Sequence, residues 1–192
     1  MTDQTIFNDY LAQEYNILRD LKRQEQVITL LVDEIVSTSI QGRKAILFGN
    51  GGSASTASHI VCDLAKGATI PGKTKVKAIC LTDNIPMVTA WANDADYESI
   101  FAQQLEVYYE PGDLVIAISG SGNSPNVLKG VNVAKDKGAV CFGLCGFHGG
   151  KLAKLANHAI IISGENIQQA EDFHLIVLHL VFLMVAERLR AH

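Results

Sequence analysis

The sequence lacks any hydrophobic run long enough to cross a membrane. Its most apolar segment, residues 173–186, is shorter than the roughly 20 residues that a bilayer-spanning helix needs, and it contains two histidines. The sequence also lacks a long Lys/Arg run, and its net charge is −4, which disfavours nucleic acid as a partner. The first sixteen residues show no signal-peptide pattern. We therefore expect a cytoplasmic protein with neither a membrane nor a nucleic-acid partner.

Cysteine is scarce and shows no C-x-x-C pattern. The four cysteines are expected to be reduced thiols, three of them in apolar strand-like runs: Cys62, Cys80, Cys141 and Cys145. There is no linker or low-complexity tract. The 192 residues, 48% hydrophobic and 19% charged, fit one domain that spans residues 1–192.

Helical and strand-like patterns alternate along the chain. Periodicity over residues 5–40 predicts one long helix or two in succession, so that residues 1–42 form a helical extension. Continuous apolar runs then predict five buried strands, at 44–48, 76–81, 114–119, 139–145 and 159–163. Helical patterns follow the strands at about 53–66, 84–107, 125–138, 149–156 and 167–190. Without hairpin signals, this order predicts an α/β fold with a doubly wound parallel sheet.

The final helical pattern is apolar on all sides, so we expect it to be buried all round. Together with the long N-terminal helix, it predicts a helical interface and a homo-oligomer.

Two loops rich in glycine and serine directly follow predicted strands. Residues 49–53 read GNGGS, and residues 119–124 read SGSGNS. Each loop precedes a helical pattern, so its backbone N–H groups and hydroxyls gather at a helix N-terminus, where the helix dipole favours an anion. Two such loops at the carboxyl edge of a parallel sheet predict a phosphorylated ligand.

Several titratable residues could carry chemistry. His59 and Asp63 lie four residues apart on one helix face, where they could bind a divalent metal, place a base beside an imidazole, or form a plain surface pair. In the final helix, Glu171 and His174 could also be a surface pair, and His179 a core residue. Glu171 and His179 are separated by about 12 Å of helix rise, so one metal could reach both only with long reach, with a bend at the helix start, or with ligands from different subunits.

Two loop motifs leave their roles open. Asn93 and Asp94 follow a helical pattern and could contact sugar hydroxyls, or Asp94 or Asp96 could cap the next helix. Residues 148–150 predict a turn into a short helix without chemistry.

The ordered combination of both loops, His59, Asn93-Asp94 and the late Glu171 and His179 resembles the sugar isomerase (SIS) family, and within it the phosphoheptose isomerases. The resemblance covers essentially the whole chain. It implies a homotetramer of flavodoxin-like subunits that converts sedoheptulose 7-phosphate, a phosphorylated seven-carbon sugar, to D-glycero-D-manno-heptose 7-phosphate for bacterial lipopolysaccharide or capsule.

The resemblance also implies the roles of individual residues. It places one zinc ion per subunit on four ligands: His59, Asp63, Glu171 and His179. Three of these would be catalytic: Asp63, Glu171 and His179. Eleven residues would bind the substrate: Asn50, Gly51, Gly52, Ser53, Asn93, Asp94, Ser119, Gly120, Ser121, Ser124 and Glu171.

Four positions depart from the family pattern. The family usually has Glu, Thr, Asp and Gln where this chain has Asp63, Gly120, Gln168 and Glu171. These differences leave Asp63 and Glu171 as alternative bases and another sugar phosphate as an alternative substrate. A further alternative is a non-catalytic SIS tetramer that binds a phosphosugar or a replication-initiation protein. Such relatives lack the terminal-helix histidine, so His179 favours an enzyme.

Overall fold

The computed structural model describes residues 2–70 and 72–191. Its centre is a sheet of five parallel strands in the order β2-β1-β3-β4-β5. The strands are β1 (Lys44–Gly49), β2 (Lys77–Cys80), β3 (Leu114–Ser119), β4 (Val140–Gly146) and β5 (His158–Ile162). Continuous apolar runs became strands because helices cover both faces of the sheet. The predicted α/β fold is therefore confirmed.

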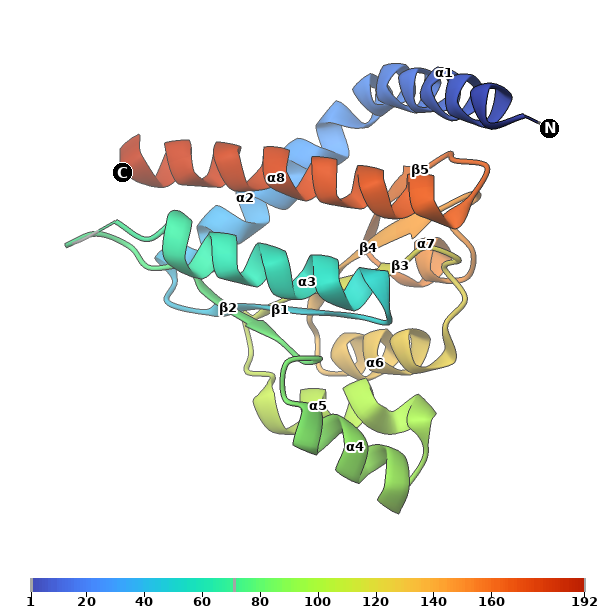
Figure 1. The fold of residues 1–192 in the computed structure, drawn as a ribbon. Helices are drawn as coiled ribbons and strands as arrows, with labels where there is room; N and C mark the ends of the chain where they lie inside the picture. Colours follow the sequence, from blue (N-terminus) through green and yellow to red (C-terminus); the bar gives the residue numbers. More distant parts are fainter. Residues whose placement is uncertain (1, 71, 192) are drawn as a thin grey trace.

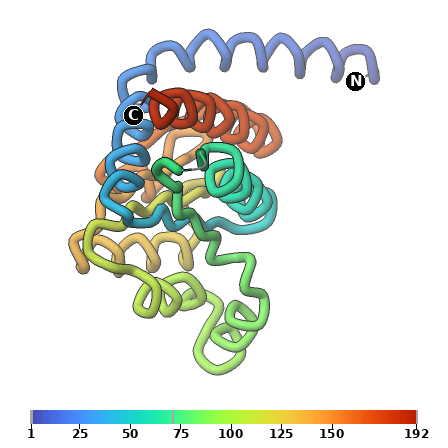
Figure 2. Tube along the Cα trace, turned by 90° about the vertical axis from the view of Figure 1, so that its left-hand side faces the viewer, coloured from blue at the N-terminus to red at the C-terminus, as the bar shows by residue number. Residues whose placement is uncertain are grey.

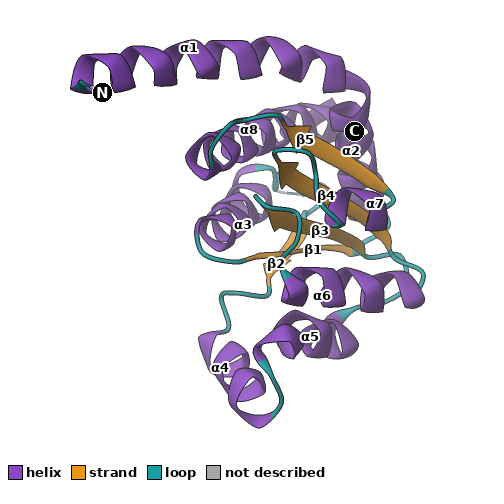
Figure 3. Cartoon of the chain, turned by 90° about the vertical axis from the view of Figure 1, so that its right-hand side faces the viewer, coloured by secondary structure: helices purple, strands orange, loops and turns teal. Residues whose placement is uncertain are grey.

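Helices flank the sheet in two layers (Figure 1). One apolar core lies between the sheet and α2 (Glu25–Ile40), α3 (Gly52–Cys62) and α8 (Ile167–Ala191). A second core lies on the other face, against α4 (Ile85–Asp94), α5 (Ile100–Tyr108), α6 (Pro125–Asp136) and α7 (Leu152–Leu155) (Figure 3). The short turns η1 (Lys22–Gln24), η2 (Asp63–Gly67) and η3 (Tyr97–Ser99) complete the order.

The pattern over residues 84–107, which we read as one helical segment, is two helices. The backbone leaves the helical region at Ala95 and Asp96. Ser99 donates its hydroxyl to the Asp96 carboxylate at 2.7 Å, and such short side chains compete with helical hydrogen bonding. Helix α7 is shorter than expected because Gly149 and Gly150 both adopt positive φ.

The α1 helix (Asp3–Leu21) lies apart from the sheet and crosses above α8 (Figure 2). Tyr10 donates to Asp172 at 2.5 Å, and Gln169 donates to Gln13 at 2.7 Å. The single chain does not bury helix α8 on all sides, since Ile176, Leu180 and Leu183 are exposed. Helix α1 exposes its own apolar face: Ile6, Phe7, Leu11, Tyr15 and Leu18. Within the described ranges, no helix combines the length and apolar character that crossing a membrane requires.

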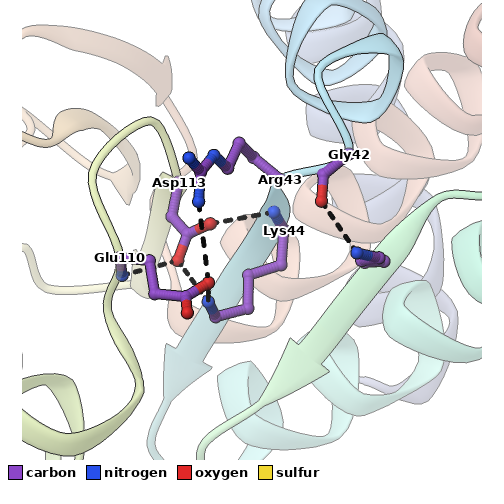
Figure 4. Close-up of polar contacts among 6 residues, drawn as sticks. Gly42, Arg43, Lys44, Glu110 and Asp113 are labelled. Atoms are coloured by element: carbon purple, nitrogen blue, oxygen red, sulfur yellow. Dashed lines mark hydrogen bonds and ion pairs between the residues drawn. The ribbon is translucent and has the colours of Figure 1, made fainter.

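A buried carboxylate ties the amino ends of β1 and β3 together (Figure 4). Asp113 accepts the backbone N–H of Lys44 at 2.9 Å and that of Glu110 at 2.8 Å. The Lys44 ammonium lies 2.6 Å from Asp113 and 2.9 Å from Glu110. Burial alone would lower the pKa of Lys44, but these two partners raise it above its usual value. The contacts fix the sheet at the edge opposite the two loops.

Candidate active site

The two glycine-rich loops lie side by side at the reversal of strand order. The first follows β1 and the second follows β3, and these strands are neighbours, with Gly49 paired to Ile118 near their ends. In a sheet of order 2-1-3-4-5, this is the switch point where open α/β proteins bind ligands. The topology therefore joins two segments some seventy residues apart into one crevice edge.

The first loop holds a carboxylate from the protein itself. Gly51 adopts a φ of +53°, which favours glycine, and no side chain caps the start of α3. A Cβ on Gly52 would lie within 2.4 Å of both carboxylate oxygens of Glu171. Ser53 is buried. The Glu171 charge thus occupies the N-terminal end of α3, where the helix dipole favours an anion.

The second loop presents hydroxyls instead. The hydroxyls of Ser119 and Ser124 lie 3.1 Å apart, and Ser121 is exposed with its oxygen accepting the Asn123 N–H at 3.2 Å. Gly122 adopts a φ of +64°, which turns the chain toward α6. Since a carboxylate repels a phosphate, the hydroxyl-lined second loop is the better anion site of the two.

Three potential metal ligands meet between α3 and α8. The Nε2 atoms of His59 and His179 are 3.0 Å apart, and Asp63 Oδ2 lies 3.4 Å from the first and 3.6 Å from the second. Gly67 supports this arrangement, because a Cβ there would lie 2.8 Å from the Phe182 ring. Because glycine has no side chain, the Phe182 ring of α8 can pack against the turn that follows Asp63.

The donor set fits a zinc ion. Tetrahedral zinc with bonds of about 2.0–2.1 Å separates its ligand atoms by about 3.3 Å. The three measured separations, 3.0, 3.4 and 3.6 Å, bracket that value. Two imidazoles and one carboxylate also leave a coordination position for a ligand oxygen.

The predicted fourth ligand lies elsewhere in this chain. The cluster of possible ligands contains His59, Asp63 and His179, whereas Glu171 lies against Gly52 in the first loop. The reason is the helix rise between Glu171 and His179, which places the two side chains at different levels of α8. Asn93 and Asp94 lie in the last turn of α4, both exposed, with Asn93 donating to Asp94 at 2.8 Å.

Two further polar residues of this region were not singled out for a role by the sequence. Tyr97 donates to Asn50 at 3.2 Å, and Asn126 is buried in the first turn of α6. No signal marked them, since each belongs to an ordinary helix start.

The reading of His174 as a surface partner of Glu171 is wrong, because His174 is 1% exposed. Burial lowers its pKa to about 4, against a small opposing effect of the Cys145 backbone.

This doubly wound sheet with two ligand loops at its switch point defines a SIS domain, and the SIS domain family model matches residues 9–146. The phosphoheptose isomerase of Helicobacter pylori is 33% identical over 181 residues, which is 94% of each chain. That of Aquifex aeolicus is 38% identical over 154 residues, or 80% of each chain. The solved phosphoheptose isomerase of Francisella tularensis superposes with a TM-score of 0.91 at 25% identity, covering 97% of this chain and all of that one. The chain belongs to the phosphoheptose isomerase family of SIS-domain proteins.

Proposed function

We propose that the protein isomerises sedoheptulose 7-phosphate to D-glycero-D-manno-heptose 7-phosphate. The observation that carries the proposal is the His59, Asp63 and His179 cluster between α8 and α3, the helix that begins at the first loop, together with the hydroxyl-lined second loop at the ligand edge. The substrate phosphate would bind the second loop through Ser119, Ser121 and Ser124. Binding energy gathered there, away from the chemistry, positions the reacting carbons.

We propose that His59, Asp63 and His179 hold one zinc ion. Zinc bound there would act as a Lewis acid on the sugar oxygens. Isomerisation moves a proton between C1 and C2, which requires a carboxylate base and a group that exchanges a proton with oxygen. Glu171 lies outside the cluster, so its carboxylate would be available to move the proton, whereas Asp63 would hold the metal. His179, on the same helix, would be the group that exchanges a proton with oxygen.

The two carboxylates can be told apart by combining kinetics with metal analysis. Glu171→Gln should lower kcat by about 10²-fold or more and keep the metal, because general-base catalysis contributes at least that much. Asp63→Asn should lose both metal and activity. Asp172→Asn, which changes the neighbouring exposed carboxylate that Tyr10 contacts, serves as the matched control. A Glu171→Gln enzyme with full kcat would instead assign the base to Asp63.

We also propose a cytoplasmic homotetramer in which residues 1–192 form one SIS domain with residues 1–42 as its helical extension. The exposed apolar faces of α1 and α8 border a groove of about 520 Å³ that includes Leu18, Leu180 and Met184. Burying these faces between subunits would remove them from water. Leu183→Glu should then lower the mass measured by light scattering, whereas an unchanged mass would place the interface elsewhere.

A further inference from the structure

A polar cluster joins three segments at the ligand edge of the sheet: Asn50 in the first loop, Asn126 in the first turn of α6, and Tyr97 in η3. The Asn50 amide donates to the Asn126 oxygen at 2.9 Å, and the Asn126 amide donates to the Asn50 oxygen at 2.8 Å. Tyr97 adds a hydrogen bond to the same Asn50 oxygen at 3.2 Å. Asn126 is 2% exposed, so this reciprocal pair is shielded from water on one side.

The backbone fixes the polarity of the pair. The Val127 N–H donates to the Asn126 side-chain oxygen at 2.9 Å. Because a backbone N–H can only donate, the Asn126 oxygen must face it, and the Asn126 amide nitrogen must face Asn50. Turning the Asn50 amide over would set oxygen against oxygen and NH₂ against NH₂. Asn126 therefore determines which way the Asn50 carboxamide points.

The hydrogen-bond count leaves a donor free at the ligand edge. The Asn50 amide nitrogen carries two hydrogens, and one of them is given to Asn126. The other has no acceptor among the hydrogen bonds of the described residues. Asn50 itself is half-buried directly after β1, at the switch point. Its orientation thus presents an N–H group where a ligand oxygen would bind.

We propose that Asn126 is a positioning residue that holds Asn50 as a hydrogen-bond donor to an oxygen of the bound ligand. Tyr97 assists by occupying the second acceptor site of the Asn50 oxygen. The inference rests on the proposed isomerase function. Small displacements of a binding group lower catalytic rates strongly. Breaking the hydrogen bonds between Asn126 and Asn50 should therefore slow catalysis because Asn50 is misplaced.

The test is a double-mutant cycle on kcat/KM for sedoheptulose 7-phosphate. Asn50→Ala and Asn126→Ala should each lower kcat/KM by about tenfold or more. The double variant should stay within about threefold of Asn50→Ala, because Asn126 has nothing left to position. Tyr97→Phe should lower kcat/KM about threefold, since Asn50 keeps its hydrogen bonds with Asn126. Losses that multiply in the double variant, or a normal kcat/KM in Asn126→Ala, overturn the proposal.

A second asparagine provides the control for a purely structural effect. Asn157 accepts the Cys141 N–H at 2.9 Å, near the amino ends of β4 and β5. Asn157→Ala should lower the melting temperature and leave kcat/KM unchanged. A wild-type protein without turnover would overturn the proposed function, and the same variants would then be compared by their Kd for sedoheptulose 7-phosphate. An unchanged Kd in both single variants would in that case overturn the positioning role.

Discussion

Removing the Asp113 carboxylate should destabilise the fold without touching the ligand edge. Asp113→Ala deletes a side chain that is fully buried and leaves the N–H groups of Lys44 and Glu110 without their acceptor. It also takes one of two carboxylates from the Lys44 ammonium, whose side chain is only 17% exposed. Breaking a buried pair from one side costs about 3–5 kcal/mol. Since Lys44 retains Glu110 at 2.9 Å, we expect the low end, a loss of about 3 kcal/mol.

The assay is urea unfolding at one protein concentration, where the midpoint should fall and the slope stay constant. Asp33→Ala is the matched control. Asp33 pairs with Arg188, and both side chains are more than one-third exposed, so its removal should cost at most about 1 kcal/mol. Equal losses in the free energy of unfolding for the two variants would refute the argument that burial makes the Asp113 contacts more stabilising. Enzyme activity of Asp113→Ala below its unfolding range should match the wild type.

Three further predictions concern reactivity, acid stability and packing. Cys62 is exposed and should react rapidly with a thiol reagent in the folded protein, while Cys145, whose pKa burial raises to about 12, should react only on unfolding. His174 has a pKa of about 4 in the folded protein against about 6.5 in the unfolded protein, so the unfolded state binds more protons between those two pH values. The free energy of unfolding should therefore fall as the pH drops from about 6.5 to 4, and His174→Phe should reduce this pH dependence in unfolding measurements. Gly67→Val should displace the Phe182 ring and weaken zinc binding measured by competition with a chelator, whereas unchanged affinity would show that this contact does not hold the cluster together.

The fold was predictable because its signals are local. The apolar runs of Lys44–Gly49 and Leu114–Ser119 and their trailing loops are contiguous in the sequence, and parallel topology then places both loops at one edge. The break at Ala95 and Asp96 was predicted only in part. The helical pattern of residues 84–107 continues on both sides of it, but the alternative in which Asp94 or Asp96 caps a next helix agrees with the position of Asp96 directly before η3.

The site was only partly predictable because its parts come together through tertiary packing. His59 and Asp63 share a helix and could be paired from spacing, but their meeting with His179 depends on how α8 packs against α3. The spacing of Glu171 and His179 predicted that they lie at different levels of one helix, and the structure places Glu171 at the first loop. The reciprocal bond of Asn50 and Asn126 joins residues 76 positions apart, which no local pattern encodes.

The most direct test of the proposed function is turnover of sedoheptulose 7-phosphate by metal-analysed protein, with added zinc and with a chelator. The geometry of His59, Asp63 and His179 predicts about one zinc per subunit and an activity that the chelator removes and zinc restores. Bound zinc without turnover would contradict the assignment of this sugar phosphate. Absence of both zinc and turnover would contradict the catalytic metal site itself.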